Sequence, residues 1–308
     1  MGGEVVESVD LSHFGAVELR LAVIRKNGIM AKSTDVQGAQ ALERAVAVMK
    51  IVATHDRSGG IRLSDITRLS RLTTPTAHRI IRALEQHGFL ERDQGSGLYQ
   101  LGPEIFILGT IASVRYGLDR VASQSIARLA HETGDTALLT ARRFWHGVCL
   151  SRAEGSYPIR VQIVAPGDRH PLGVTSGGLA ILASLSDEEI EQALAANEEE
   201  LQVWPNFAPA KLREEVLHTR AEGFALNRGR LIAGSWGLAV GINGPDGQCV
   251  GALTIAAVER RFEGSRIGEL TRLLRIEVAH IENCLAEPTR VANSIDTAST
   301  RHSNSVRR

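Results

Sequence analysis

The sequence is poor in cysteine and lacks any long apolar run. Its 308 residues include three cysteines that lie far apart in the chain, Cys149, Cys249 and Cys284. Because they form neither a metal-binding spacing nor a disulfide framework, we expect reduced, mostly buried thiols in a cytoplasmic protein. No apolar segment approaches the length of a membrane span and no signal peptide is evident, so no membrane partner is expected.

The overall charge is balanced, with 35 basic and 35 acidic residues and a formal net charge of zero. The chain as a whole therefore gives no indication of nucleic-acid binding. Locally, residues 40–102 contain nine Arg or Lys residues against six Asp or Glu residues, an excess of three positive charges. A local excess of this sign is suited to phosphate groups.

Residues 63–101 have the pattern of a winged helix-turn-helix. Leu63, Ile66 and Leu69 are spaced so that a short helix buries one side. We expect Ser64 to be the N-cap of this helix, because its hydroxyl can accept from a free backbone N–H of the first turn.

A second, longer helix follows a tight turn. Thr74 is the expected N-cap and Pro75 the first helical residue, where the missing N–H has no cost. Gly88 ends the helix as the residue after the C-cap. Residues 89–92 and 97–101 then predict a hairpin about the polar segment between them.

The solvent side of these elements carries hydroxyl, imidazole and guanidinium groups. A recognition helix lies in the major groove with its N-terminal residues at base edges and phosphates, which such groups can reach. The residues predicted to contact DNA are Ser64, Thr73, Thr74, Thr76, His78, Arg79, Arg82 and Arg92. The alternative is an amphipathic helix pair with a solvated basic side.

Residues 41–102 resemble the DNA-binding domain of IclR-type bacterial transcription regulators, and the resemblance continues through most of the chain. Residues 40–54 predict a helix with Leu42, Val46, Met49 and Val52 or Ala53 on one stripe. The resemblance implies that this helix packs under the helix-turn-helix and helps to pair protomers. It also implies that the second domain is a GAF-like effector-binding domain.

Residues after Pro103 predict a linker helix and then a second helix that ends at Gly134. Their apolar residues could form a core stripe or a seam between protomers. These residues are Ile105, Leu108, Ile111 and Val114. We favour a homodimer, or a dimer of dimers, because a palindromic operator in double-stranded DNA requires two recognition helices.

From Asp135 the apolar period changes to two, which indicates strands at residues 137–144, 147–154 and 159–165 and a hairpin within 238–258. Helices are expected to begin after Thr175 and after Ser186, at 209–223 with Leu212, Val216 and Leu217 buried, and at 264–285. An antiparallel sheet flanked by helices follows, so the fold class is α+β.

The predicted organisation has five parts. An N-terminal extension (1–37), in which translation could begin at Met30, precedes the winged helix-turn-helix domain (38–102). A linker helix (103–118) joins it to an effector-binding and oligomerisation domain (119–286). A tail (287–308) rich in Ser, Thr, Asn and Arg is expected to be disordered.

The resemblance places an effector between the sheet and the loop before the helix that begins at Ser176. Glycines there allow a ligand to approach the backbone, and a helix N-terminus offers free N–H groups to an anion. The residues implied are Thr175, Ser176, Gly177, Gly178, Asn227, Arg228, Gly237, Thr254 and Ala256. The alternative for the first four is a simple capped helix start.

The sequence departs from the family pattern after residue 226, where Arg228 and Arg230 replace an acidic stretch and Gly237 replaces a cysteine. We therefore expect an anionic effector, such as an aromatic or aliphatic carboxylate, held by Arg228 or Arg230. The alternative is that both arginines lie on a solvated loop. Trp145, Trp236 or Tyr157 could stack on a ring, although each is more often a core or rim residue.

These patterns predict a sequence-specific transcription regulator whose operator binding is modulated by a small molecule. One alternative is an architectural DNA-binding protein with a vestigial pocket. The other is an enzyme with an appended DNA-binding module, suggested only by Ser176 near His170. Because no strand-elbow motif, metal pair or phosphate loop supports catalysis, we expect no enzyme, cofactor or metal.

Overall fold

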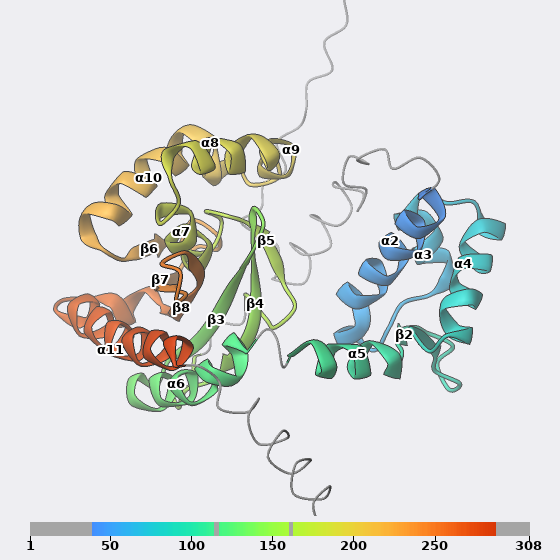
Figure 1. The fold of residues 1–308 in the computed structure, drawn as a ribbon, viewed down its shortest axis with the longest axis horizontal. Helices are drawn as coiled ribbons and strands as arrows, with labels where there is room; N and C mark the ends of the chain where they lie inside the picture. Colours follow the sequence, from blue (N-terminus) through green and yellow to red (C-terminus); the bar gives the residue numbers. More distant parts are fainter. Residues whose placement is uncertain (1–38, 114–116, 160–162, 288–308) are drawn as a thin grey trace, which may run out of the picture. The chain divides into compact units, whose positions relative to one another are not determined.

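The computed structural model describes residues 39–113, 117–159 and 163–287 (Figure 1). It contains two compact units, one built mainly from residues before position 118 and the other mainly from residues after it. The expectations for the N-terminal extension, for Val114 and for the tail after residue 287 lie outside the described residues. None of the described helices is both long enough and apolar enough to span a membrane.

The first unit is a bundle of helices with a two-stranded hairpin. Its elements are α2 (Gln40–His55), η2 (Asp56–Ser58), α3 (Leu63–Ser70), α4 (Thr74–Gln86), β1 (Leu90–Arg92), β2 (Tyr99–Leu101) and α5 (Pro103–Ser113). The helix-turn-helix, the hairpin and the linker helix therefore occur in the predicted order.

The core of this unit is formed where α2, α3, α4 and the hairpin meet. Ile66 of α3 and Ile81 of α4 are almost fully buried. On α2 the buried residues are Ala47, Val48, Ile51 and Val52, whereas Leu42 is 66% exposed. Of the predicted stripe, Val52 is buried and Val46 and Met49 are half-buried, whereas Leu42 and Ala53 are exposed. A helix rich in Ala and Val offers several apolar stripes, and only packing selects one.

Both predicted N-caps of the helix-turn-helix were wrong by one or two positions. Helix α3 begins at Leu63 with Arg62 as its N-cap, and α4 begins at Thr74 with Thr73 as its N-cap. Neither cap residue makes a side-chain capping hydrogen bond. The Thr73 hydroxyl instead lies 2.9 Å from the hydroxyl of Thr76, so the two side chains satisfy each other.

The end of α4, the hairpin and the start of α5 are joined by backbone hydrogen bonds. Gly88 has φ +71°, as expected of a residue that ends a helix. The N–H of Gly102 donates to Phe89 O at 2.9 Å, and the N–H of Glu104 donates to Gly88 O at 3.0 Å. A methyl group at Gly102 would lie 2.2 Å from Gly88 O, so only glycine fits at this crossing.

The chain after residue 117 forms a sheet with helices on both sides (Figure 1). Its elements are α6 (Leu118–Thr133), β3 (Thr136–Arg143), β4 (His146–Ala153), β5 (Arg169–Pro171), α7 (Ser176–Ala183), α8 (Asp187–Ala196), α9 (Glu198–Leu201), η3 (Pro205–Phe207), α10 (Pro209–Glu222), β6 (Ala225–Arg228), β7 (Ser235–Asn243), β8 (Cys249–Val258), η4 (Glu259–Phe262) and α11 (Arg266–Ala286). The six strands lie in the order β5-β4-β3-β8-β7-β6, and every neighbouring pair is antiparallel.

The two faces of this sheet are covered by different helices. Helices α6 and α11 pack on one face, where Leu139, Leu238, Leu253 and Ile255 are buried in the main apolar core. Helix α7 packs on the opposite face against β7 and β8, and Figure 1 shows it on the other side of the strands from α6 and α11. Residues that alternate along a strand therefore enter different environments.

Most predicted elements of this domain are present, with three differences. The expected strand at 159–165 includes residues 160–162, which are not described, and the flanking described residues are not in a strand. The short edge strands β5 and β6 and the short helices α9, η3 and η4 were not predicted. On α10, Leu212 and Val216 are buried as expected, but Leu217 is 66% exposed.

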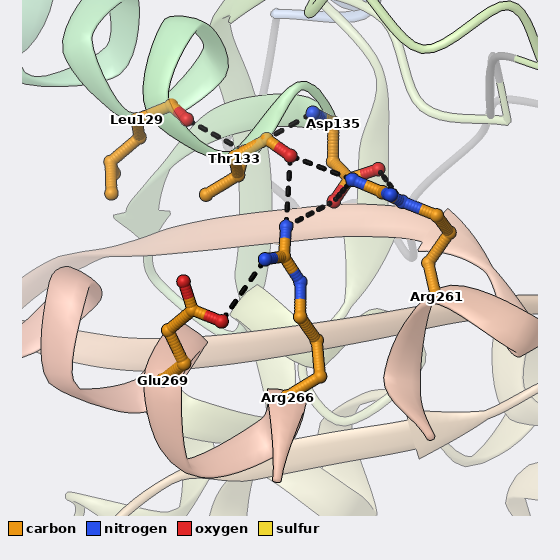
Figure 2. A network of polar contacts seen from close by, with 6 residues as sticks. All are labelled: Leu129, Thr133, Asp135, Arg261, Arg266 and Glu269. Atoms are coloured by element: carbon orange, nitrogen blue, oxygen red, sulfur yellow. Dashed lines mark hydrogen bonds and ion pairs between the residues drawn. The ribbon is translucent and has the colours of Figure 1, made fainter. Parts of the chain in front are cut away.

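Three ion pairs, two of which share Asp135, hold the helices that pack against the main apolar core. Arg128 of α6 donates to both carboxylate oxygens of Glu277 on α11, at 2.9 and 2.6 Å. At the start of β3, the buried carboxylate of Asp135 accepts from Arg261 of η4 and Arg266 of α11 (Figure 2). The first pair joins α6 to α11, and the contacts of Asp135 join the start of β3 to η4 and to the start of α11.

Candidate DNA-binding surface and effector site

The outer side of α4 is a polar surface with unpaired cations. The side chains of Thr73, Thr74, His78, Arg79 and Arg82 are exposed, while Ala77 and Ile81 turn into the core. Within the part of the chain that the structure describes, Arg79 and Arg82 form no ion pair. Their charge is therefore available to an external anion, as the predicted recognition helix requires.

Two further residues predicted to contact DNA, Thr76 and Ser64, differ in whether their hydroxyl groups are available to a partner. Thr76 is partly buried, and its hydroxyl is shared with Thr73 at 2.9 Å. Ser64 is exposed in the first turn of α3, and its hydroxyl is not used as the predicted N-cap. The Ser64 hydroxyl is therefore free to meet a sugar or phosphate group.

Arg92 is held within the hairpin rather than extended from it. Its Nε donates to Gly97 O at 3.2 Å, and its guanidinium lies 5.8 Å from the centre of the Tyr99 ring. At the tip, hydrogen bonds from the side chain and backbone of Ser96 lower the pKa of Asp93, so a negative charge persists there. The hairpin thus offers one restrained cation beside an anion.

In the second unit, three buried hydroxyl groups surround the start of α7. Thr140 of β3, Ser176 of α7 and Thr254 of β8 are each no more than 6% exposed. None of these hydroxyls hydrogen-bonds to another described residue, and the Oγ1 atom of Thr254 is fully buried without a partner. A buried hydroxyl without a partner is costly, which makes this cluster a candidate ligand site.

Two glycines bring these hydroxyls close to the helix backbone. A methyl group at Gly177 would lie 2.6 Å from Thr140 Oγ1 and 3.0 Å from Thr254 Oγ1. A methyl group at Gly237 would lie 2.5 Å from Ser176 Oγ. The glycines are therefore required for the close approach of β7, β8 and α7.

The N-terminus of α7 is capped at one position and open at two others. Thr175 accepts from the N–H of Gly178 at 3.0 Å, so the expected cap is present. The N–H groups of Ser176 and Gly177 have no acceptor among the described residues. These two donors lie beside the hydroxyl cluster and can bind an anion or a polar oxygen.

Strand pairing decides which other predicted effector residues share this face. Gly237 pairs with Ala256 across β7 and β8, and with Asn227 across β6 and β7. Both Asn227 polar atoms are engaged, since Nδ2 donates to Val174 O at 3.2 Å and Oδ1 accepts from the N–H of Arg230 at 3.0 Å. Asn227 therefore shapes the wall beside α7 and has little capacity left for a ligand.

The structure separates Arg228 from this group. Arg228 pairs with Trp236, which packs against the core face together with Phe262, and its guanidinium lies 5.9 Å from the Trp236 ring centre. Arg228 thus lies on the opposite face of the sheet from Asn227. Arg230 forms an ion pair with Glu215 at 3.1 Å, so its charge is already paired with a carboxylate of the protein.

The aromatic candidates also lie in separate places. Trp236 is on the core face, Trp145 lies 5.9 Å from the guanidinium of Arg142, and Tyr157 lies 4.4 Å from that of Arg261. Thr140 was missed at the sequence level. Alternation along β3 could have placed it on the same face as Leu138, but not beside Gly177.

The described residues include no cluster that could hold a metal ion. Among them, Ser176 makes no hydrogen bond to a basic side chain. A winged helix-turn-helix with an exposed recognition helix, joined to a second domain built on an antiparallel sheet, is the architecture of a DNA-binding transcription regulator.

The chain belongs to the IclR family of bacterial transcription regulators. The family model for the C-terminal domain of bacterial transcriptional regulator IclR matches residues 112–283, and the model for the IclR helix-turn-helix domain matches residues 41–94. The matched ranges together include the recognition helix and the hydroxyl cluster.

Curated and solved relatives agree with this assignment. The chain is 31% identical to the glycerol operon regulatory protein of Streptomyces coelicolor, over 80% of this chain and 93% of that protein. It is 27% identical to the regulator BhcR of Paracoccus denitrificans, over 80% and 87% of the two chains. The crystal structure of an IclR regulator from a Silicibacter species has a TM-score of 0.68 at 26% identity, over 80% and 97% of the chains.

Proposed function

We propose that this regulator binds its operator as a homodimer and that a small carboxylate, bound at the start of α7, modulates the binding. The observation that carries the effector proposal is the Oγ1 atom of Thr254, which is buried without a partner beside Gly177. A ligand oxygen there would supply the missing hydrogen bond.

The preference for an anion rests on donors rather than on arginines. The free N–H groups of Ser176 and Gly177 lie at the positive end of the α7 dipole. The hydroxyls of Thr140, Ser176 and Thr254 add up to three further donors. Arg228 lies on the other face, and Arg230 is engaged in an ion pair with Glu215. The anion would therefore be held by backbone N–H and hydroxyl groups rather than by the expected arginine side chains.

A protein of the same fold contains a ligand of this class. The crystal structure of an IclR homologue from Microbacterium hydrocarbonoxydans, with a TM-score of 0.65 at 24% identity, is a complex with 4-hydroxybenzoate. That ligand belongs to the Microbacterium protein, and it makes aromatic acids a reasonable first group to test with this chain.

The dimer proposal rests on α5. Phe106, Ile107, Leu108 and Ile111 are between 45% and 76% exposed, although the helix carries one charged residue. Of the two alternatives for this apolar surface, a core stripe and a seam between protomers, its exposure favours the seam. Pairing would present two recognition helices to a palindromic operator.

Thermal unfolding of the full-length protein tests the effector site. The probes are benzoate, 4-hydroxybenzoate, acetate and succinate, with benzamide and acetamide as neutral counterparts, at fixed salt and protein concentration. An acid at ~100 times its dissociation constant should add about 2.7 kcal/mol of stability, while its amide should add less.

The matched control is Thr254→Val, which keeps the side-chain shape and removes the unpartnered hydroxyl. Because that hydroxyl is buried, the variant should be as stable as the natural chain or more stable. Its response to the active acid should be lost or strongly reduced. An equal response in both proteins would place the ligand elsewhere, and an equal response to acid and amide would remove the anion preference.

A further inference from the structure

Arg71 has an unusual backbone conformation in the turn between α3 and α4. Its φ of 54° and ψ of 24° are left-handed, a region that glycine enters freely and an arginine enters at a cost. Among the described residues, the only other non-glycine with positive φ is Phe144. Glycine would therefore suit the fold better than arginine at position 71.

The side chain of Arg71 contributes nothing visible to the fold. It is exposed, and it makes no hydrogen bond, ion pair or ring contact with any residue in the described part of the chain. The neighbouring Arg68, by contrast, pairs with Asp65 at 2.7 Å. A strained residue with an unused charge points to a partner outside the chain.

The position of Arg71 indicates what that partner is. The turn lies between the two helices of the motif, and Thr73, two residues later, is the N-cap of the recognition helix. In a helix-turn-helix the N-terminal residues of this helix enter the major groove, so the adjoining turn comes near the sugar-phosphate backbone. A planar guanidinium binds phosphate through two parallel hydrogen bonds.

We propose that Arg71 contacts a DNA phosphate and so helps to fix the position of the recognition helix on DNA. The contact would act equally on all sequences, because phosphates carry no base information. This inference rests on the DNA binding that the family assigns to the first domain. It adds a residue that was absent from the predicted DNA-binding set.

A purely structural explanation is also available and predicts different results. A cation after the last turn of α3 interacts favourably with the negative end of that helix dipole. If this were its role, removing the charge would destabilise the first unit. The proposed phosphate contact instead predicts that Arg71→Gly stabilises the fold, because glycine relieves the backbone strain, and weakens DNA binding at the same time.

The test compares Arg71→Gly and Arg71→Ala with the natural chain. Binding to a labelled mixed-sequence duplex is measured by fluorescence anisotropy across a series of salt concentrations, and unfolding is followed by calorimetry. Both variants should bind more weakly, and the slope of log K against log salt should fall by about 0.9 for each protomer bound. The Tm should rise by about 2–5 °C in Arg71→Gly and stay unchanged in Arg71→Ala.

Phe144→Gly is the matched control, because it relieves the same strain in the other unit. It should raise the Tm without changing the salt slope. An unchanged slope in both Arg71 variants, with the natural chain showing normal salt-dependent binding, overturns the phosphate contact. A lower Tm in both variants together with an unchanged slope supports the helix-dipole role instead, whereas a natural chain that fails to bind any duplex would refute DNA binding itself.

Discussion

Two neighbouring residues at the end of β6, Asn227 and Arg228, lie on opposite faces of the sheet. Asn227 faces α7 and bonds to Val174 O, while Arg228 faces the opposite side and stacks on Trp236. The sequence places them side by side, and both were predicted to line one pocket. Because side chains alternate across a strand, only the pairing with β7 assigns each to its face.

At the residue scale, the pair Arg128 and Glu277 should make stability depend on pH. Burial raises the pKa of Glu277, but the hydrogen bonds from Arg128 and Ser125 outweigh this effect and hold it below the ordinary value of 4.5. A carboxylate with a lowered pKa stabilises the fold above its unfolded pKa and loses this effect as the pH falls through its folded pKa. In thermal unfolding, the Tm should therefore decrease as the pH is lowered below about 4.5.

Glu277→Gln should lower stability at neutral pH by about 1–2 kcal/mol, a modest value because Arg128 is partly exposed. It should also make the acid-induced fall of Tm shallower. Glu263→Gln, at an exposed residue, is the control and should leave the profile unchanged. A profile that is identical in the Glu277 variant and the natural chain would contradict the assignment.

At the element scale, the sequence alone predicted the helices and strands that are long enough to show a regular apolar period. The helices of the motif and strands β3, β4, β7 and β8 follow from their apolar periods, and the hairpin follows from the polar, glycine-containing turn after Gly88. The edge strands β5 and β6 have three and four residues, too few to show a period. Of the hydroxyl cluster, Ser176 and Thr254 were predicted and Thr140 was not, because Thr140 comes close to Gly177 and Thr254 only through packing of distant segments.

Two arginines of α4 allow the contribution of base recognition to DNA binding to be measured separately from that of attraction to phosphate. Arg79 and Arg82 are exposed one turn apart, with Arg79 nearer the N-terminus that enters the groove. Arg79→Ala should weaken operator binding by about 1–3 kcal/mol and relax specificity, whereas Arg82→Ala should mainly lower the salt slope by about one.

Operator and mixed-sequence duplexes, titrated side by side, provide both measurements. Arg272→Ala, which removes an exposed cation from α11, is the control for a general loss of charge. Unchanged affinity and slope in both α4 variants would mean that another side of the helix faces DNA.

At the scale of the whole molecule, oligomeric state should depend on α5. Replacing Phe106 and Ile111 with serine removes the two most exposed apolar side chains of this helix. We expect the mass measured by light scattering to fall to that of a monomer, and operator affinity to fall with it, because one recognition helix then binds alone.

Leu217→Ser on α10 is a close control, since Leu217 and Ile111 are both 66% exposed. It should leave mass and affinity unchanged. A dimeric mass in the α5 double variant would assign the pairing of protomers to another surface.

The glycine crossing at the end of α4 has a mechanical consequence. Because Gly102 touches Gly88 and Glu104 donates to Gly88 O, the recognition helix, the wing and the first turn of α5 are fastened together. These three segments should therefore move as one rigid body, with little bending between them. In the proposed homodimer, a signal that rotates α5 by a few degrees would change the distance between the two recognition helices without changing how each helix contacts its own half-site.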